Sequence, residues 1–121
     1  MTALETSLEK ALKQLRSALD EETNDLVRDA AIQRFEFTVE LAWKAIQQWL
    51  RGEGIVCNSP KECLKAAFTA GLVKDDDRWL TMMEDRNLTS HTYNEKTAED
   101  IFSRLSGYLE PLEGLVQTLK A

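Results

Sequence analysis

Leucine and alanine residues recur at steps of three and four along the first part of the chain. This spacing places their side chains on one face of a helix, so the pattern predicts an amphipathic helix that ends near Asp20. The polar segment Glu21–Asn24 is expected to form the turn that follows it. The residues of this predicted face are Leu4, Leu8, Ala11, Leu12, Leu15, Ala18 and Leu19.

A second, longer helix is predicted from about Asp25 to Arg51, because Gly52 and Gly54 then interrupt the helical pattern. At about 100° per residue, its apolar side chains form two stripes on different sides. One stripe contains Ile32, Phe35, Val39, Trp43, Ile46 and Leu50, and the other contains Phe37, Leu41, Ala45 and Trp49. We therefore expect this helix to be central in a bundle and also to contact a second copy of the chain.

A third, short helix is predicted to begin in the segment Ser59-Pro60-Lys61-Glu62. Ser59 can cap it, Pro60 is tolerated at the first helical position, and Glu62 would complete a capping box. Gly71 is expected to end this helix.

Two more helices complete the pattern. The acidic run Asp75–Asp77 is expected to begin a fourth helix that reaches the neighbourhood of Arg86, because acidic side chains oppose the dipole at a helix N-terminus. A fifth helix carries apolar residues from Ile101 to Leu119. Pro111 lies inside it and is expected to cause a kink or a break, since proline cannot donate a backbone hydrogen bond.

No segment has the alternating pattern of a strand, and the chain contains no internal repeat. The sequence therefore predicts an all-α fold, an up-and-down antiparallel helical bundle of four long helices plus one short helix. A length of 121 residues with 43% hydrophobic content suits one domain, so residues 1–121 are expected to form a single domain.

The charge balance narrows the possible partners. The chain has 21 acidic and 15 basic residues and a net charge of -6, which argues against a broad, sequence-independent grip on nucleic acid phosphates. Any contact with RNA must then be local. No apolar run is long enough for a membrane span, and the first residues lack the pattern of a secretory signal, so we expect a cytoplasmic protein without a membrane partner.

Several kinds of site are not indicated. Cys57 and Cys63 form no CxxC pair and have no histidine cluster beside them, so we expect reduced cysteines and neither a disulfide nor a zinc site. Gly52 and Gly54 are not followed by the residues of a phosphate-binding loop. We therefore expect no cofactor and no metal, and the chain is not expected to be a nucleotidyltransferase itself.

Residues 82–93 carry the candidate chemistry. Within eight residues this segment holds Arg86, His91, the only histidine in the chain, and Tyr93, at the point where the fourth helix should end. An imidazole can accept or donate a proton near neutral pH, and a guanidinium can hold a phosphate through two directed hydrogen bonds. Together they suit attack on a phosphodiester.

Arg86, four intervening residues, His91, one residue and Tyr93 resemble the R-x4-H-x-Y motif of HepT-type proteins in the HEPN superfamily. The wider string DRNLTSHTYNE is similar to the branch of that superfamily known as nucleotidyltransferase substrate-binding proteins. The resemblance covers essentially the whole chain, in length, helix order and motif position.

The resemblance implies a homodimer with the two motifs facing a shared cleft, and a cognate minimal nucleotidyltransferase as partner in a toxin-antitoxin type pair. It implies that Arg86 and His91 are catalytic, that Asn87 supports them, and that Tyr93 accepts AMP from the transferase. RNA would be the substrate of toxin members, which cut it without a metal. Glu84 and Asp85 could instead hold Arg86 in an ion pair, which would leave the motif as a docking surface.

Three hypotheses stay open at this point. The chain could be a binding subunit that docks the nucleotidyltransferase and offers it a substrate, with Tyr93 as the AMP acceptor. It could be a metal-independent HEPN endoribonuclease that uses Arg86 and His91 and is neutralised by the transferase. It could also be a purely structural helical dimer, in which His91 caps a helix and Tyr93 is a half-buried packing residue.

Overall fold

The computed structural model describes residues 1–121 and contains five α-helices and one 3-10 helix, without strands. The α-helices are α1 (Ala3–Leu19), α2 (Asp25–Gly52), α3 (Pro60–Ala70), α4 (Asp77–Leu88) and α5 (Glu95–Lys120), and the 3-10 helix η1 spans Thr89–His91. The predicted all-α bundle is confirmed. α3 and α4 have only 11 and 12 residues, so the bundle contains three long and two short helices rather than four long and one short.

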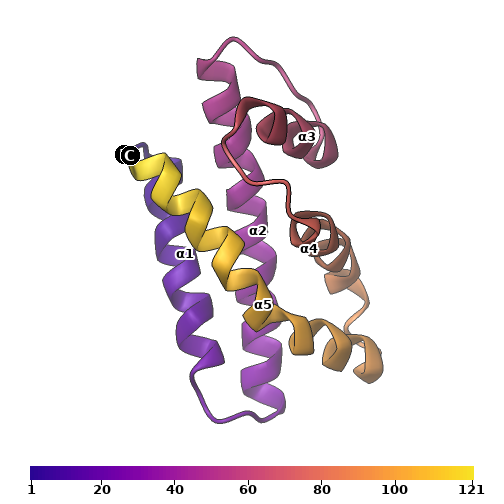
Figure 1. Ribbon diagram of the computed structural model, residues 1–121. Helices are drawn as coiled ribbons and strands as arrows, with labels where there is room; N and C mark the ends of the chain where they lie inside the picture. Colours follow the sequence, from indigo (N-terminus) through magenta and orange to yellow (C-terminus); the bar gives the residue numbers. More distant parts are fainter.

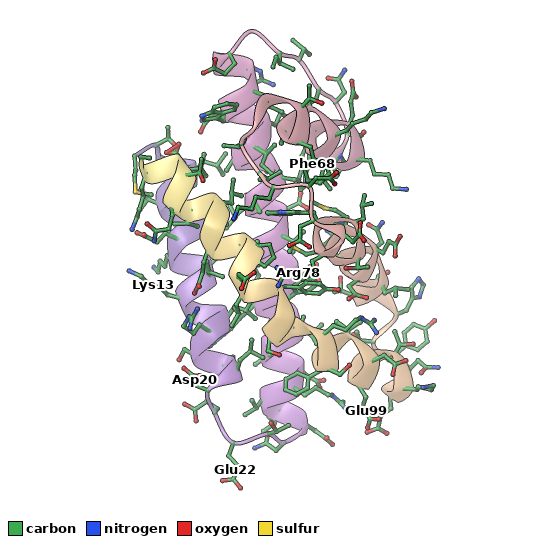
Figure 2. All side chains as sticks on the ribbon, in the orientation of Figure 1. Lys13, Asp20, Glu22, Phe68, Arg78 and Glu99 are labelled. Atoms are coloured by element: carbon green, nitrogen blue, oxygen red, sulfur yellow. A yellow bond between two sulfur atoms is a disulfide. The ribbon has the colours of Figure 1, made fainter.

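α2 is the central helix and contacts each of the other four. Figure 1 shows α1 beside α2, α5 crossing both, and α3 and α4 on the other side of α2. In Figure 2, Asp20 and Glu22 lie at the short connection between α1 and α2. All five helices contribute to one core cluster of 28 buried residues. No helix is both long and apolar enough to cross a membrane.

The two apolar stripes of α2 have different environments. The first faces the core, where Phe35 is fully buried and its ring stacks on Tyr108 of α5 with 5.6 Å between ring centroids. The second stripe is only partly covered: Ala45 is buried, Leu41 is half-buried and Phe37 is 40% exposed. Folding of one chain therefore leaves apolar surface of α2 in water.

The start and the end of α3 follow the predicted signals with one difference. Ser59 accepts a hydrogen bond from the backbone N–H of Glu62 at 3.2 Å, and Pro60 is the first helical residue. The predicted capping box does not form, because the Glu62 carboxylate accepts from the N–H of Asn58 at 3.1 Å instead of that of Ser59. Gly71 ends the helix with a φ of 78°, in the left-handed region that glycine adopts without strain.

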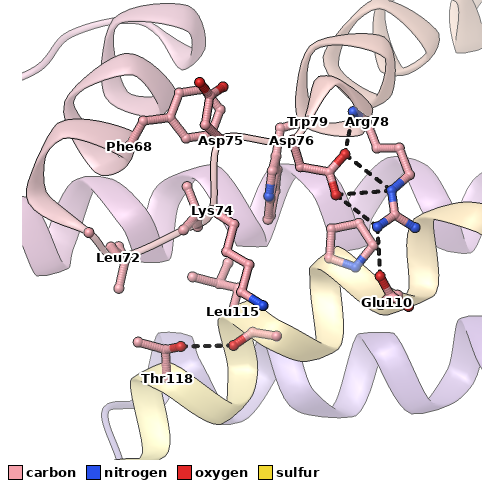
Figure 3. A pocket seen from close by; sticks show the side chains of 14 residues that line it. Phe68, Leu72, Lys74, Asp75, Asp76, Arg78, Trp79, Glu110, Leu115 and Thr118 are labelled. Carbon is pink, nitrogen blue, oxygen red and sulfur yellow. Dashed lines mark hydrogen bonds and ion pairs between the residues drawn. The ribbon is translucent and has the colours of Figure 1, made fainter.

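α5 continues through Pro111, so no break occurs, and the helix bends along its length (Figure 1). Pro111 cannot donate to the carbonyl of Gly107, four residues earlier. Arg78 of α4 takes this place and donates to the Gly107 carbonyl at 2.9 Å. Its guanidinium also bonds Asp76 and Glu110, each at 2.7 Å (Figure 3). A side chain from α4 thus satisfies the carbonyl that proline leaves free.

Cys57 and Cys63 form a disulfide, so the prediction of two reduced cysteines is wrong. Cys57 lies in the connection after α2, Cys63 lies in the first turns of α3, and their Cα atoms are 5.1 Å apart. The turn at Asn58 and Ser59 brings together two cysteines that are six residues apart, a spacing that matches neither a CxxC pair nor a wider framework. Both side chains are buried in the core.

Candidate functional site

The predicted motif lies where α4 passes through η1 into α5. Thr89 donates a side-chain hydrogen bond to the carbonyl of Arg86 at 2.6 Å, and Thr92 donates to the carbonyl of Thr89 at 3.2 Å. The carbonyl of Arg86 also accepts from the backbone N–H of Thr89, so these hydroxyls add hydrogen bonds to the end of the helix. Asn94 then caps α5. The polar residues between Arg86 and Asn94 therefore form a tight connection, and His91 lies on it.

Arg86 is held by a carboxylate from α2. Its Nη2 lies 2.6 Å from Oε2 of Glu40, which is 46 positions earlier in the chain. The Arg86 side chain is half-buried, and its Nε is buried without a hydrogen-bond partner. The sequence suggested Glu84 and Asp85 as ion-pair partners, but neither pairs with Arg86. An arginine on α4 is thus joined to the central helix rather than to its neighbours.

Glu40 is well suited to hold this position as an anion. Partial burial raises the pKa of Glu40, but the hydrogen bond from Trp43 and the charges of Arg86 and Lys44 outweigh it and bring the pKa below its ordinary value. The Trp43 indole N–H donates to the same Glu40 oxygen at 3.2 Å, and Lys44 pairs with the other oxygen at 3.4 Å. Glu40 therefore stays charged at neutral pH and keeps Arg86 engaged.

Asp85 points the opposite way, toward α5. It is 3% exposed and accepts two hydrogen bonds from Arg104, at 2.8 Å and 2.7 Å, and one from the hydroxyl of Tyr108 at 2.5 Å. Burial, together with the hydrogen bond to Asp85, raises the pKa of Tyr108 to about 12. The two adjacent residues Asp85 and Arg86 therefore attach the end of α4 to α5 and to α2.

Asp85→Asn is expected to lower the free energy of unfolding by about 1.5–3 kcal/mol, the range for a buried hydrogen bond to a charged group. The substitution keeps the shape of the side chain but removes the charge that Arg104 and Tyr108 contact. Urea denaturation followed by circular dichroism measures the change. Glu84→Gln is the matched control, because Glu84 is exposed and makes no ion pair. Equal stability of the two variants would show that the hydrogen bonds of Asp85 to Arg104 and Tyr108 do not stabilise the fold.

His91 and Tyr93 are both exposed and lie beside each other. Nδ1 of His91 is 3.4 Å from the hydroxyl of Tyr93, and the two rings meet edge-on with 6.0 Å between centroids. The backbone of Thr92 between them is helical, and the two side chains nevertheless meet. Tyr93 is 86% exposed, which overturns the interpretation of a half-buried packing residue.

A pocket of about 400 Å³ opens beside Arg86, between α2, the start of α3 and α4. Arg86 and Asn87 line it, whereas His91 and Tyr93 do not. The motif residues thus form two separate pairs: Arg86 and Asn87 at the pocket, and His91 and Tyr93 outside it. No hydrogen bond links Arg86 to His91. The complete lining is Glu40, Trp43, Ser59, Pro60, Lys61, Met83, Glu84, Arg86 and Asn87.

Sequence reasoning missed three members of this neighbourhood: Glu40, Trp43 and Lys61. The apolar pattern placed Trp43 in one of the two stripes of the second helix, and no signal singled out Glu40 or Lys61. The spacing of three between Glu40 and Trp43 on one helix could have indicated that the two side chains meet, as they do through the indole N–H. Nothing in the sequence indicated that they would meet Arg86.

Comparison with known proteins bears on the identity of the chain. Residues 5–121 match the family model described as "Nucleotidyltransferase substrate binding protein like". A protein of Haemophilus influenzae named probable ribonuclease HepT is 30% identical over 101 residues, which cover 79% of this chain and 69% of that protein. Both findings agree with the family that the motif resembles.

Solved structures share the fold. A crystal structure of a protein from Thermus thermophilus has a TM-score of 0.87 at 44% identity, covering 94% of this chain and 99% of the other. A Haemophilus influenzae structure, described as revealing the fold of a substrate binding domain of a nucleotidyltransferase, has a TM-score of 0.75 at 29% identity. That match covers 98% of this chain and 96% of the other. The chain therefore belongs to the nucleotidyltransferase substrate-binding protein family.

Proposed function

We propose that this chain is the partner subunit of a minimal nucleotidyltransferase, which it docks and to which it offers Tyr93 as the acceptor of AMP. The observation that carries the proposal is the exposed phenol of Tyr93, 86% accessible and 3.4 Å from the imidazole of His91. A related structure is described as a substrate-binding domain of a nucleotidyltransferase, which supports the choice of partner.

The reaction would proceed by displacement at phosphorus. The Tyr93 oxygen attacks the α-phosphorus of ATP, the bond from that phosphorus to the bridging oxygen breaks, and pyrophosphate leaves with the electron pair. His91 is placed to accept the phenol proton after a small rotation that shortens the 3.4 Å separation. The transferase would supply the ATP and magnesium sites.

Incubating the chain with its cognate minimal nucleotidyltransferase, ATP and magnesium tests this function. Intact-mass spectrometry should show additions of about 329 Da for each AMP, a covalent modification that adds negative charge. The transferase must first be shown to be active on another acceptor or on itself. If an active transferase does not bind this chain, or binds it without labelling it, the proposed function is wrong.

A second candidate function is the cleavage of RNA, which the relative named probable ribonuclease HepT supports. In this reaction, His91 takes the proton of a ribose 2'-hydroxyl, whose oxygen attacks the adjacent phosphorus. The bond from phosphorus to the 5'-oxygen breaks, and the 5'-oxygen leaves with the electron pair and takes up a proton from water. Arg86 would stabilise the charge on the phosphorane. One N–H of Arg86 already bonds Glu40, so an RNA phosphate must use its remaining N–H groups or displace that carboxylate.

We also expect the chain to form a homodimer through the second apolar stripe of α2, because Phe37 and Leu41 of this stripe leave apolar surface in water. Light scattering at micromolar concentration should give the mass of a dimer. Phe37→Glu should yield soluble monomers, since a buried unpaired carboxylate opposes association. Lys10→Glu, a charge change on the exposed face of α1, should stay dimeric.

A monomeric mass for the unmodified chain would contradict the dimer. Aggregation of Phe37→Glu would instead mean that the stripe belongs to the core, in conflict with its exposure.

A further inference from the structure

The pocket beside Arg86 combines an aromatic ring, two cationic side chains and uncommitted polar groups from three helices. From this combination we infer that it is a subsite for one unpaired nucleotide, with the base against Trp43 and the phosphate between Arg86 and Lys61. The inference rests on the proposed role of Arg86 at a phosphodiester, and it adds a binding site for the neighbouring nucleotide of an RNA strand.

The size and the walls of the pocket suit such a ligand. Its volume of about 400 Å³ lies within the range of small-molecule sites, roughly 300–1,000 Å³. One wall is the segment Ser59–Lys61, which lies inside the loop closed by the disulfide Cys57–Cys63. Gln47 of α2 also donates to the carbonyl of Cys57 at 2.8 Å. The wall is therefore fixed to α2 and α3 before any ligand arrives.

Trp43 can provide the surface for the base. Its side chain is half-buried and lines the pocket, and its indole N–H is held by Glu40 at 3.2 Å. This bond restrains the orientation of the ring. Stacking on an aromatic ring is the common way in which proteins hold an unpaired base, and it accepts any of the four bases. Bases inside a duplex are not available for such contact.

The charged groups favour a nucleotide over a simple anion. Lys61 is exposed and makes no ion pair, and Arg86 has N–H groups beyond the one that bonds Glu40. Glu40 and Glu84 also line the pocket, so its formal charge is balanced. Inorganic phosphate would meet two carboxylates, whereas a nucleotide adds base amino groups that Glu84 or Asn87 can contact by hydrogen bonds.

Binding of a labelled single-stranded RNA hexamer with 2'-O-methyl groups, which cannot be cleaved, tests the inference by fluorescence anisotropy. Trp43→Leu should raise Kd about tenfold, within the range measured for loss of one base–aromatic stack. Lys61→Ala should raise Kd a few-fold and reduce the slope of log Kd against log salt by about 0.7. Trp43→Phe, which keeps an aromatic ring, should retain most of the affinity.

Two variants serve as matched controls. Leu80→Ala removes an exposed apolar side chain of α4 outside the pocket, and Lys65→Ala removes an exposed lysine one turn further along α3. Both should bind the hexamer as the unmodified chain does. Thermal melts of all variants separate loss of binding from loss of fold.

Competition distinguishes the nucleotide from its parts. AMP should displace the hexamer at millimolar concentration, whereas inorganic phosphate and an RNA duplex should not. Absence of hexamer binding, equal effects of the pocket and control variants, or competition by phosphate as strong as that by AMP would each overturn the subsite. Cleavage of an unmodified RNA strand tests the proposed role of Arg86 separately, and labelling of Tyr93 by the transferase does not depend on the subsite.

Discussion

Tyr93→Phe is expected to abolish the transfer of AMP to this chain while leaving its fold and its contact with the transferase intact. The substitution removes only the phenol oxygen, which is the proposed nucleophile, and Tyr93 is 86% exposed and so contributes little to packing. Intact-mass spectrometry after incubation with the transferase, ATP and magnesium should show no addition of about 329 Da per AMP. Co-elution with the transferase should be unchanged.

Tyr108→Phe is the matched control, because Tyr108 is the only other tyrosine in the chain. It is 2% exposed and its hydroxyl is bonded to Asp85, so it is not accessible to a transferase. This variant should be somewhat less stable and should still be labelled on Tyr93. Undiminished labelling of Tyr93→Phe would show that another residue accepts the nucleotide.

Labelling of Tyr93 should also inhibit any cleavage of RNA. The added AMP brings at least one negative phosphate charge and a bulky base next to His91, which lies 3.4 Å from the acceptor oxygen. An incoming RNA backbone would then be excluded by the volume and by the charge of the group. The transfer of AMP to Tyr93 would then regulate the cleavage of RNA at the neighbouring His91.

Arg86→Ala and His91→Ala are each expected to lower the rate of RNA cleavage by a factor of about 100 or more. His91 is the only histidine and is exposed, so it is accessible to a ribose 2'-hydroxyl. The products should carry 2',3'-cyclic phosphate ends, and cleavage should persist in EDTA because no step uses a metal. Electrophoresis of a labelled RNA strand measures both the rate and the ends.

Arg51→Ala and Ser90→Ala are suitable controls. Arg51 is an exposed arginine without an ion pair, and Ser90 is the exposed neighbour of His91. Both variants should cleave at the unmodified rate. Cleavage that stops with chelator, or that survives the loss of Arg86 and of His91, would exclude this mechanism and leave docking and AMP acceptance as the function.

The helices and most of their ends could be predicted from the amino-acid sequence alone. Apolar spacing and capping depend on residues three or four apart, so the start of α3 at Ser59 and its end at Gly71 follow from neighbouring residues. The family could also be predicted from the sequence, because Arg86, His91 and Tyr93 lie within one short motif of eight residues. The contact between His91 and Tyr93 does not follow from their separation of two residues, because the backbone of Thr92 between them is helical.

The partners of those side chains became visible only when the helices were packed together. Arg86 pairs with Glu40, 46 positions away, and Asp85 with Arg104, 19 positions away. Two adjacent residues on one helix face different neighbours, so their partners depend on which helices pack on either side. The disulfide and the pocket wall at Lys61 depend likewise on how the connection after α2 folds back. Local hydrogen bonding determines a helix, whereas packing between helices determines the chemistry of its surface.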